Sequence, residues 1–404
     1  MLLRWRNWLK NKVSRDTTSG QFIPEIDGLR FIAIFSVVLF HWVGTIVTKT
    51  SRTSEHDPLI TFFAHGHYGV QLFFVISGAV IALPFAKGHL KGEKLPNLKN
   101  YFLRRLTRLE PPYVLHLLIR FVFFSMIFNY SAEPLSNQLL HLLASLAYLH
   151  NIIYGTWSTI SSVAWSLEVE LQFYILAPII TSIFMIKSKN YRRIFLVSLI
   201  ALFSSMSFLI KGSPRFDLSI FSYAHFFLTG FLLIDVYITE WNQAPEKTLK
   251  WDILSVLSWL AVVALFYQGE VGKALFVVPL FIAYCGAFRG VWSNRFFCQP
   301  LIYIIGGMCY TIYLYHFAVI QIMTIILNMF GINFEFFFVS PLWLVFITSS
   351  LILVPLILLI SALLFILVEK PCMKKDWHIR LYERFKVPFK ALLILPAALR
   401  KLRP

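Results

Sequence analysis

Polar and ionisable side chains interrupt the long apolar runs of this sequence, and two of them stand in the first run. A charged group inside a bilayer costs free energy, so ionisable residues at that depth are candidates for function. Arg30 and His41 are eleven positions apart in the segment from EIDGLR to FHW. On a helix this spacing places both side chains on one face, roughly 16 Å apart along the axis. His41 suits abstraction of a hydroxyl proton, although a histidine on an apolar helix also serves as a hydrogen-bond partner between helices.

Three arginines precede the third apolar run, in the segment NYFLRRLTRLEPPY. They are Arg104, Arg105 and Arg108, called here the arginine cluster, and Arg104 and Arg108 share a helical face. Guanidinium groups bind phosphate oxygens through paired hydrogen bonds, so the cluster and Arg30 are candidate ligands for a phosphorylated donor such as coenzyme A. Two structural alternatives stay open: the cluster can contact lipid headgroups, and Arg30 can anchor its helix at the membrane surface.

A further group of polar residues follows helical spacing in the segment AWSLEVELQFYILAP. Ser166, Glu170 and Tyr174 stand four positions apart and form one stripe on an otherwise apolar helix. A carboxylate in this setting must be protonated or paired. Glu170 is therefore either a site residue, accompanied by Tyr174, or the structural partner of an arginine or histidine.

Three more side chains are candidates on weaker grounds. Tyr313 and His316 are three positions apart in GGMCYTIYLYHFAV, where tyrosines near the end of a span are also typical of an interfacial belt. Ser77, in GVQLFFVISG, is a possible nucleophile, yet its spacing along the sequence places no base beside it. Its neighbour Gly78, and Gly230 in HFFLTG, are small residues at which we expect helices to pack closely.

The elements that must position these residues follow from the composition. Of the 404 residues, 58% are hydrophobic and only 14% are charged, which excludes an ordinary soluble domain. Continuous apolar runs recur along the chain, and a bilayer admits only helices or closed barrels as spanning structures. We therefore predict an all-α integral membrane protein with about ten transmembrane helices. The predicted spans are residues 29–47, 68–86, 112–128, 165–186, 194–210, 221–239, 251–267, 274–288, 301–330 and 341–368.

The formal net charge of +17 is distributed unevenly about these spans. With the N-terminus in the cytoplasm and the side alternating at each span, 30 of the 37 Lys and Arg residues fall on the inner side and five on the outer side. Cytoplasmic loops are the ones enriched in Lys and Arg, so we predict that both termini are cytoplasmic. Such a basic collar contacts anionic lipid headgroups, and we exclude nucleic acid as a partner.

The chain divides into three parts on this reasoning. They are a basic N-terminal segment over residues 1–28, a transmembrane domain over 29–373 and a basic cytoplasmic tail over 374–404. The four cysteines form no CxxC pair and have no metal-ligand spacing, so we expect neither a disulfide nor a metal site. Within 131–164 the amphipathic stretch SNQLLHLLASLAYLH is expected either to lie in the outer interface or to fold back over the bundle.

Taken in order, these segments resemble the acyltransferase-3 family of membrane O-acyltransferases, over residues 24–371. The parallels are IPEIDGLRFIAIFSVVLFHW, GVQLFFVISG, YFLRRLTRLEPPY, WSLEVELQFY, FFLTG, YTIYLYH and VEKP. Two positions depart from the family pattern: Gln71 stands where many members carry aspartate, and Cys309 where serine is common. The resemblance is to the stand-alone form, without the hydrolase-like domain that many members carry.

The resemblance implies transfer of an acyl group, most often acetyl from acetyl-CoA, to a hydroxyl of a cell-surface polysaccharide or its lipid-linked precursor. It implies a bacterial inner (plasma) membrane and a donor that is a substrate, with no permanently bound cofactor. His41, Glu170 and Tyr174 would be the catalytic residues, while Arg30 and the arginine cluster would bind acyl-CoA. His41 would act either as general base toward the acceptor or as a transient acyl carrier.

Two other classes of function compete with this interpretation. A transporter or flippase for glycans or lipid-linked sugars would also be an aromatic-rich bundle with few charges, but it predicts internal repeats, and none stands out in the sequence. A non-catalytic receptor or scaffold is the other alternative. Neither the acceptor sugar nor the oligomeric state follows from the sequence.

Overall fold

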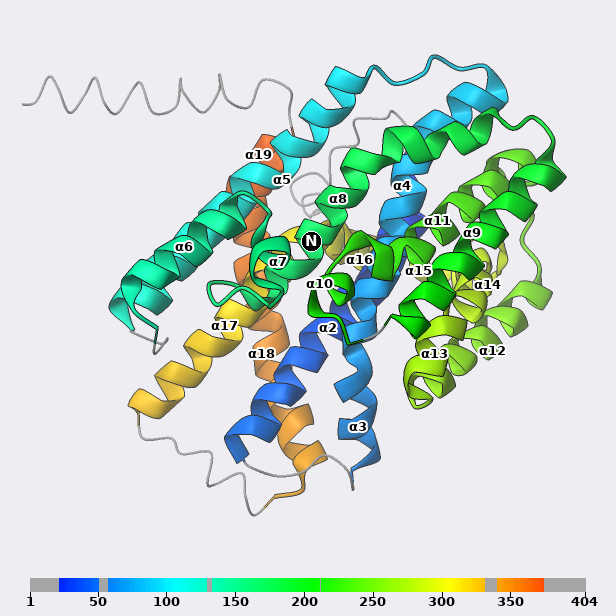
Figure 1. Cartoon of the computed structure of the whole chain (residues 1–404). Coiled ribbons are helices and arrows are strands. Elements are labelled where there is room, and N and C mark those ends of the chain that lie inside the picture. Colours follow the sequence, from blue (N-terminus) through cyan, green and yellow to red (C-terminus); the bar gives the residue numbers. More distant parts are fainter. Residues whose placement is uncertain (1–21, 51–56, 129–132, 211, 331–339, 374–404) are drawn as a thin grey trace, which may run out of the picture.

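The computed structural model describes residues 22–50, 57–128, 133–210, 212–330 and 340–373, and within these ranges the chain is built of helices without a β-strand. Figure 1 shows a bundle with α2 and α4 near its centre, α12 to α14 at one side and α6 and α17 at the other. The longer helices are α2 (Pro24–Thr50), α4 (Gly69–Lys91), α5 (Leu98–Arg120), α8 (Trp165–Ile180), α9 (Lys189–Leu209), α11 (Ile220–Thr239), α12 (Leu249–Phe266), α14 (Val277–Arg289), α17 (Cys309–Met329) and α18 (Leu342–Leu364).

Shorter helices connect or extend these elements. They are α3 (Pro58–Ala64), η1 (His65–Tyr68), η2 (Phe121–Ile127), α6 (Leu135–Leu146), α7 (His150–Tyr154), η3 (Ser162–Ala164), η4 (Thr181–Met185), α10 (Pro214–Asp217), α13 (Gly269–Leu275), α15 (Trp292–Phe297), α16 (Pro300–Gly307), η6 (Phe365–Glu369) and α19 (Lys370–Cys372). Most of the predicted N-terminal segment and the whole predicted tail, 374–404, lie outside the described residues.

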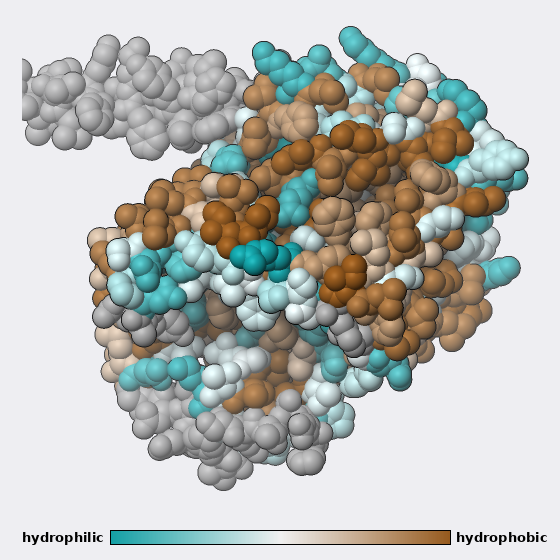
Figure 2. All heavy atoms as spheres, in the orientation of Figure 1, coloured by the Kyte–Doolittle hydropathy of each residue, from teal (hydrophilic) through white to brown (hydrophobic). Residues whose placement is uncertain are grey.

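Nine helical segments among the described residues are long and apolar enough to cross a membrane, which confirms the all-α integral membrane fold. The eighth predicted span, 274–288, corresponds to α14, an apolar helix of 13 residues that is shorter than the roughly 20 residues a bilayer core requires. Figure 2 shows hydrophobic side chains over much of the visible surface. On α18 alone, Leu351 and Ile352 are 72% and 66% exposed, as expected for side chains that face lipid.

Two predicted boundaries are wrong. The prediction that the third span opens at Pro112 fails, because α5 begins at Leu98 and runs through Pro111 and Pro112, so the arginine cluster lies on a helix and not in a loop. The ninth predicted span, 301–330, is two helices separated at Met308. The first of these, α16, packs along α2, where a Cβ at Gly306 would collide with the backbone carbonyl of Asp27.

Glycines allow α4 and α11 to pack closely, as predicted. Among the described helices, these two share the most extensive interface. A Cβ at Gly78 would collide with the carbonyl of Phe227, and one at Gly230 with the carbonyl of Val75. Only glycine permits this approach, so the two helices pack backbone against backbone.

The amphipathic stretch of 131–164 forms α6, which folds back along α5 and η2. The hydroxyl of Tyr113 on α5 donates a hydrogen bond to the carbonyl of Ser145, at 3.0 Å. Leu142 and Gln138 of α6 are buried, whereas Leu139 and Leu143 are exposed. The inward face of α6 therefore packs against the bundle, which is one of the two positions predicted for this stretch.

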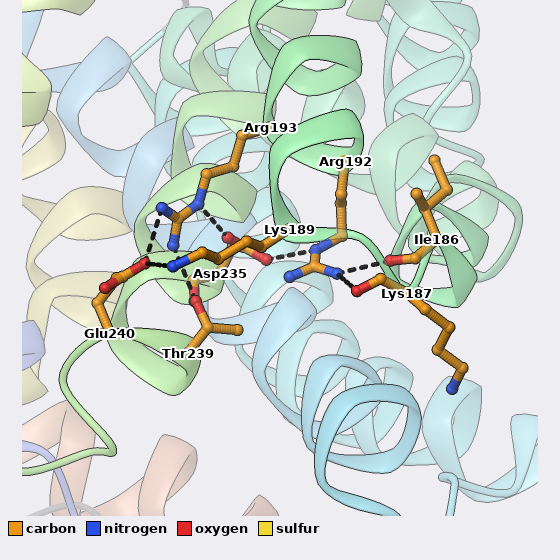
Figure 3. Close-up of polar contacts among 8 residues, drawn as sticks. All are labelled: Ile186, Lys187, Lys189, Arg192, Arg193, Asp235, Thr239 and Glu240. Carbon is orange, nitrogen blue, oxygen red and sulfur yellow. Dashed lines mark hydrogen bonds and ion pairs between the residues drawn. The ribbon is translucent and has the colours of Figure 1, made fainter.

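A buried ion pair joins α9 to α11. Figure 3 shows the carboxylate of Asp235 between two arginines, with Arg192 Nε at 2.5 Å from one oxygen and Arg193 Nε at 2.7 Å from the other. The side chains of Asp235 and Arg192 are 0% and 1% exposed. Arg192 also donates to the carbonyl of Ile186, at 2.5 Å, and Arg193 contacts Glu240 at 3.0 Å. The charges of this end of the two helices are thus compensated within the protein.

Candidate active site

A cavity lined by both polar and apolar side chains opens among α2, α4, α5, α8 and α17. It encloses about 750 Å³ of space between atoms, part of which is open to solvent. Seven of the ten predicted site residues line it, although they come from five helices. These seven are Arg30, Ser77, Arg105, Arg108, Glu170, Tyr174 and Tyr313.

The carboxylate of Glu170 is the centre of the cavity's hydrogen bonds. Ser77 Oγ donates to Glu170 Oε1 at 2.6 Å, and the Tyr174 hydroxyl donates to the same oxygen at 2.5 Å. Spacing along the sequence places no base beside Ser77, but the structure brings the carboxylate of Glu170 to it from α8. Its partner comes from another helix, and spacing along one helix cannot show that.

Arg105 holds a fixed position over aromatic rings on the cavity wall. Its guanidinium carbon lies 5.3 Å from the ring centroid of Tyr174 and 5.9 Å from that of Tyr101. The hydroxyl of Tyr101 donates to the carbonyl of Tyr174, at 3.1 Å, and so ties α5 to α8. A cation within about 6 Å of an aromatic face is attracted by it, which leaves the N–H groups of Arg105 able to bind a ligand.

Arg108 and Arg30 each have a carboxylate nearby. Arg108 Nη2 is 3.9 Å from Glu369 Oε1, and the other oxygen of Glu369 accepts hydrogen bonds from the amide, at 3.2 Å, and the hydroxyl of Thr311. Arg30 forms an ion pair with Asp27 one turn earlier on α2. Glu369 and Asp27 were not predicted as site residues. Both stand in segments quoted for the family resemblance, VEKP and EIDGLR, and these segments were the signal in the sequence that could have identified them.

Arg104 lies outside the cavity. Its side chain is exposed, whereas Arg105 and Arg108 are partly buried and face the cavity. The helical phase that pairs Arg104 with Arg108 therefore does not identify the cavity-facing side. On α5 that side is defined by Arg105 and Arg108, which stand three positions apart.

His41 and His316 form a second group, deeper along α2 and α17. Their ring centroids are 5.1 Å apart, and His41 also contacts the ring of Phe317, at 4.8 Å. Tyr313 connects the two groups: its ring is 6.0 Å from that of His316, and its hydroxyl, on the cavity wall, is 2.7 Å from Ser166 Oγ. The structure thus brings all the predicted residues except Arg104 into one continuous polar region.

The helical bundle is that of an integral membrane protein. Residues 23–366 match the family described as an acyltransferase domain, and the chain belongs to the acyltransferase-3 family.

Curated relatives of the chain include proteins of Staphylococcus aureus. A protein of Staphylococcus aureus strain COL with a provisional O-acetyltransferase name is 27% identical over 330 residues, which cover 74% of this chain and 51% of the relative. The O-acetyltransferase OatA of S. aureus strain NCTC 8325 is 24% identical over 329 residues, covering 75% of this chain and 51% of OatA. The chain thus spans about half the length of the curated relatives it matches. No solved structure matches it.

Proposed function

We propose that this protein transfers an acyl group, acetyl by preference, from acyl-CoA to a hydroxyl of a cell-surface polysaccharide or of its lipid-linked precursor. The observation that carries the proposal is the arrangement of the polar region: guanidinium groups from α2 and α5 gather at one end, and a histidine pair lies further along α2 and on α17. Membership of the family and the names of the relatives support the reaction class. We place the enzyme in a bacterial plasma membrane with both termini cytoplasmic.

The donor end of the site is the arginine-lined cavity. Arg30, Arg105 and Arg108 supply donors for the phosphates of coenzyme A, and guanidinium groups match phosphate oxygens in pairs. Arg30 and His41 lie roughly 16 Å apart along α2, so the narrow pantetheine arm would thread from the cavity toward His41. Glu170, which accepts hydrogen bonds from Ser77 and Tyr174, would orient the pantetheine arm along this path.

At the other end, His41 would act on the acceptor hydroxyl, either as general base or as transient acyl carrier. The proton of the hydroxyl passes to the imidazole, the hydroxyl oxygen bonds to the acyl carbon, and the carbon–sulfur bond breaks. The released sulfur then takes the proton. If His41 is the carrier, its nitrogen holds the acyl group between two such steps.

The test of the proposal is transfer of label. Purified protein in lipid nanodiscs is incubated with radiolabelled acetyl-CoA and with polysaccharides or lipid-linked glycans from bacterial envelopes. We expect label to appear in the glycan as a base-labile ester. If the protein instead carries glycan across liposome membranes and no label is transferred, it is a flippase and the proposal is wrong.

Arg105→Ala is expected to weaken binding of coenzyme A by about tenfold or more, because a hydrogen bond to a charged group contributes about 1.5–3 kcal/mol. Arg104→Ala is the matched control, since it removes the same charge from the same helix outside the cavity. Binding is measured by calorimetry with coenzyme A in nanodiscs. Equal affinities of the two variants would show that Arg105 does not bind the donor.

A further inference from the structure

The imidazole of His316 is bound on one side and open on the other. Its Nδ1 lies 3.0 Å from the carbonyl of Ile312 and 2.8 Å from that of Tyr313. A carbonyl only accepts hydrogen bonds, so Nδ1 carries the proton and a neutral ring has a bare Nε2. This Nε2 is fully buried and has no hydrogen-bond partner among the described residues. A buried acceptor without a donor costs free energy and calls for a partner.

The ring of His41 is placed to supply that donor. It is the nearest imidazole, 5.1 Å away between centroids, and within the described part of the chain its ring makes no hydrogen bond. A second histidine pair in the same protein shows what this spacing allows. The rings of His141 and His150 are 5.0 Å apart, and a nitrogen of one lies 2.9 Å from a nitrogen of the other. Rotation about χ2, which has a broad energy minimum in histidine, would bring His41 into the same arrangement.

The two histidines differ in what can reach them. His316 is 0% exposed, whereas His41 is only partly buried. An acceptor hydroxyl can therefore contact His41 and cannot contact His316 in this arrangement. If His316 Nε2 accepts the N–H of His41, the other nitrogen of His41 must be bare and must face away from His316. In nucleophile–base systems on unrelated folds, a third group likewise holds the base in its orientation.

We propose that His316 is the positioning residue of His41: it accepts the ring N–H of His41, fixes its tautomer and directs a bare nitrogen at the acceptor hydroxyl. The inference rests on the proposed acyl transfer, with His41 in the role of general base. The hydroxyl proton moves to His41, and the oxygen bonds to the acyl carbon. As the carbon–sulfur bond breaks, His41 returns the proton to sulfur. His316 is unchanged and shares the positive charge that forms on His41.

The test compares one substitution that keeps a hydrogen-bond acceptor with one that removes it. His316→Gln keeps an acceptor near the position of Nε2, while His316→Phe keeps the ring and removes the acceptor. We expect His316→Phe to lower kcat about a hundredfold or more with little change in the KM for acetyl-CoA, and His316→Gln to restore most of the loss. The control is His225→Phe on α11. His225 is a buried histidine whose Nδ1 has no hydrogen-bond partner among the described residues, and this variant should keep full activity.

Nitrogen NMR of ¹⁵N-histidine-labelled protein in nanodiscs gives a readout that loss of packing would not produce. We expect one neutral tautomer for His41 in the wild type and in His316→Gln, and a mixture of tautomers in His316→Phe. Full activity of His316→Phe, or a fixed His41 tautomer in that variant, would overturn the inference. So would equal losses in the Phe and Gln variants. If the wild type transfers no label to any glycan, the proposed function itself is wrong, and that result is distinct from these.

Discussion

His41→Ala is expected to lower the rate of acyl transfer by about a hundredfold to ten-thousandfold, the range in which a positioned acid or base contributes. Binding of coenzyme A should change little, because His41 does not line the arginine cavity. The measurement is the initial rate of label transfer at saturating acetyl-CoA, beside calorimetric binding of coenzyme A. A variant that acylates the glycan at near the wild-type rate would end the assignment of His41.

Two companion variants test whether the imidazole of His41 itself, and not its surroundings, is responsible for the loss of activity. Thr45→Val removes the hydroxyl that donates to the carbonyl of His41, at 2.8 Å, and leaves the imidazole in place, so its activity should stay close to that of wild type. The double variant His41→Ala/His316→Phe should be no slower than His41→Ala alone, because residues that act as a unit are not additive. A further large loss in the double variant would show that His316 acts independently.

Asp235→Ala is expected to destabilise the protein by about 3–5 kcal/mol, the cost of leaving a buried charge without its partner. Arg192 has a side chain that is 1% exposed and would keep its charge with only backbone carbonyls around it. Thermal unfolding in detergent, followed by tryptophan fluorescence, should show a large fall in the midpoint. An unchanged midpoint would show that water or lipid replaces the carboxylate at no cost.

Glu240→Gln is the matched control for this ion pair. Glu240 also contacts Arg193, and Lys189 at 3.1 Å, but it is exposed at the end of the same helix. Hydrogen bonds from Lys189 and Arg193 lower the pKa of Glu240. Exposed ion pairs contribute little because water screens them, so this substitution should move the midpoint far less than Asp235→Ala.

The sequence predicts the spans well because length and hydropathy alone decide them. Helix boundaries that depend on packing against other helices cannot be predicted from the sequence in this way. Hydropathy does not show a break within the apolar run 301–330, although the pair Gly306 and Gly307 stands directly before Met308, and Gly306 is seated against α2. Pro112 was expected to begin a helix, yet α5 continues through it, as helices in a membrane can when neighbours satisfy the freed backbone groups.

For the candidate site too, contacts within one helix could be predicted from the sequence and contacts between helices could not. Helical spacing identified Glu170 and Tyr174 together, because both belong to one helix and a direct hydrogen bond joins them. It could not pair Ser77 with Glu170 or Arg108 with Glu369, because each of these contacts joins two elements that are remote in the sequence. It also chose Arg104 along with Arg108, since the rotation of α5 relative to the cavity is set by neighbouring helices and not by α5 itself.

The glycine contact between α4 and α11 has a mechanical consequence for substrate entry. Backbones that touch at Gly78 and Gly230 leave no side chains to yield between them, and Asp235 fastens α11 to α9 in turn. These three helices should therefore move as one block that carries Ser77 on its edge. Any widening of the passage that admits the donor would have to come from α2, α5, α8 and α17, so the arginines and the His316 ring would move while the wall that carries Ser77 stays still.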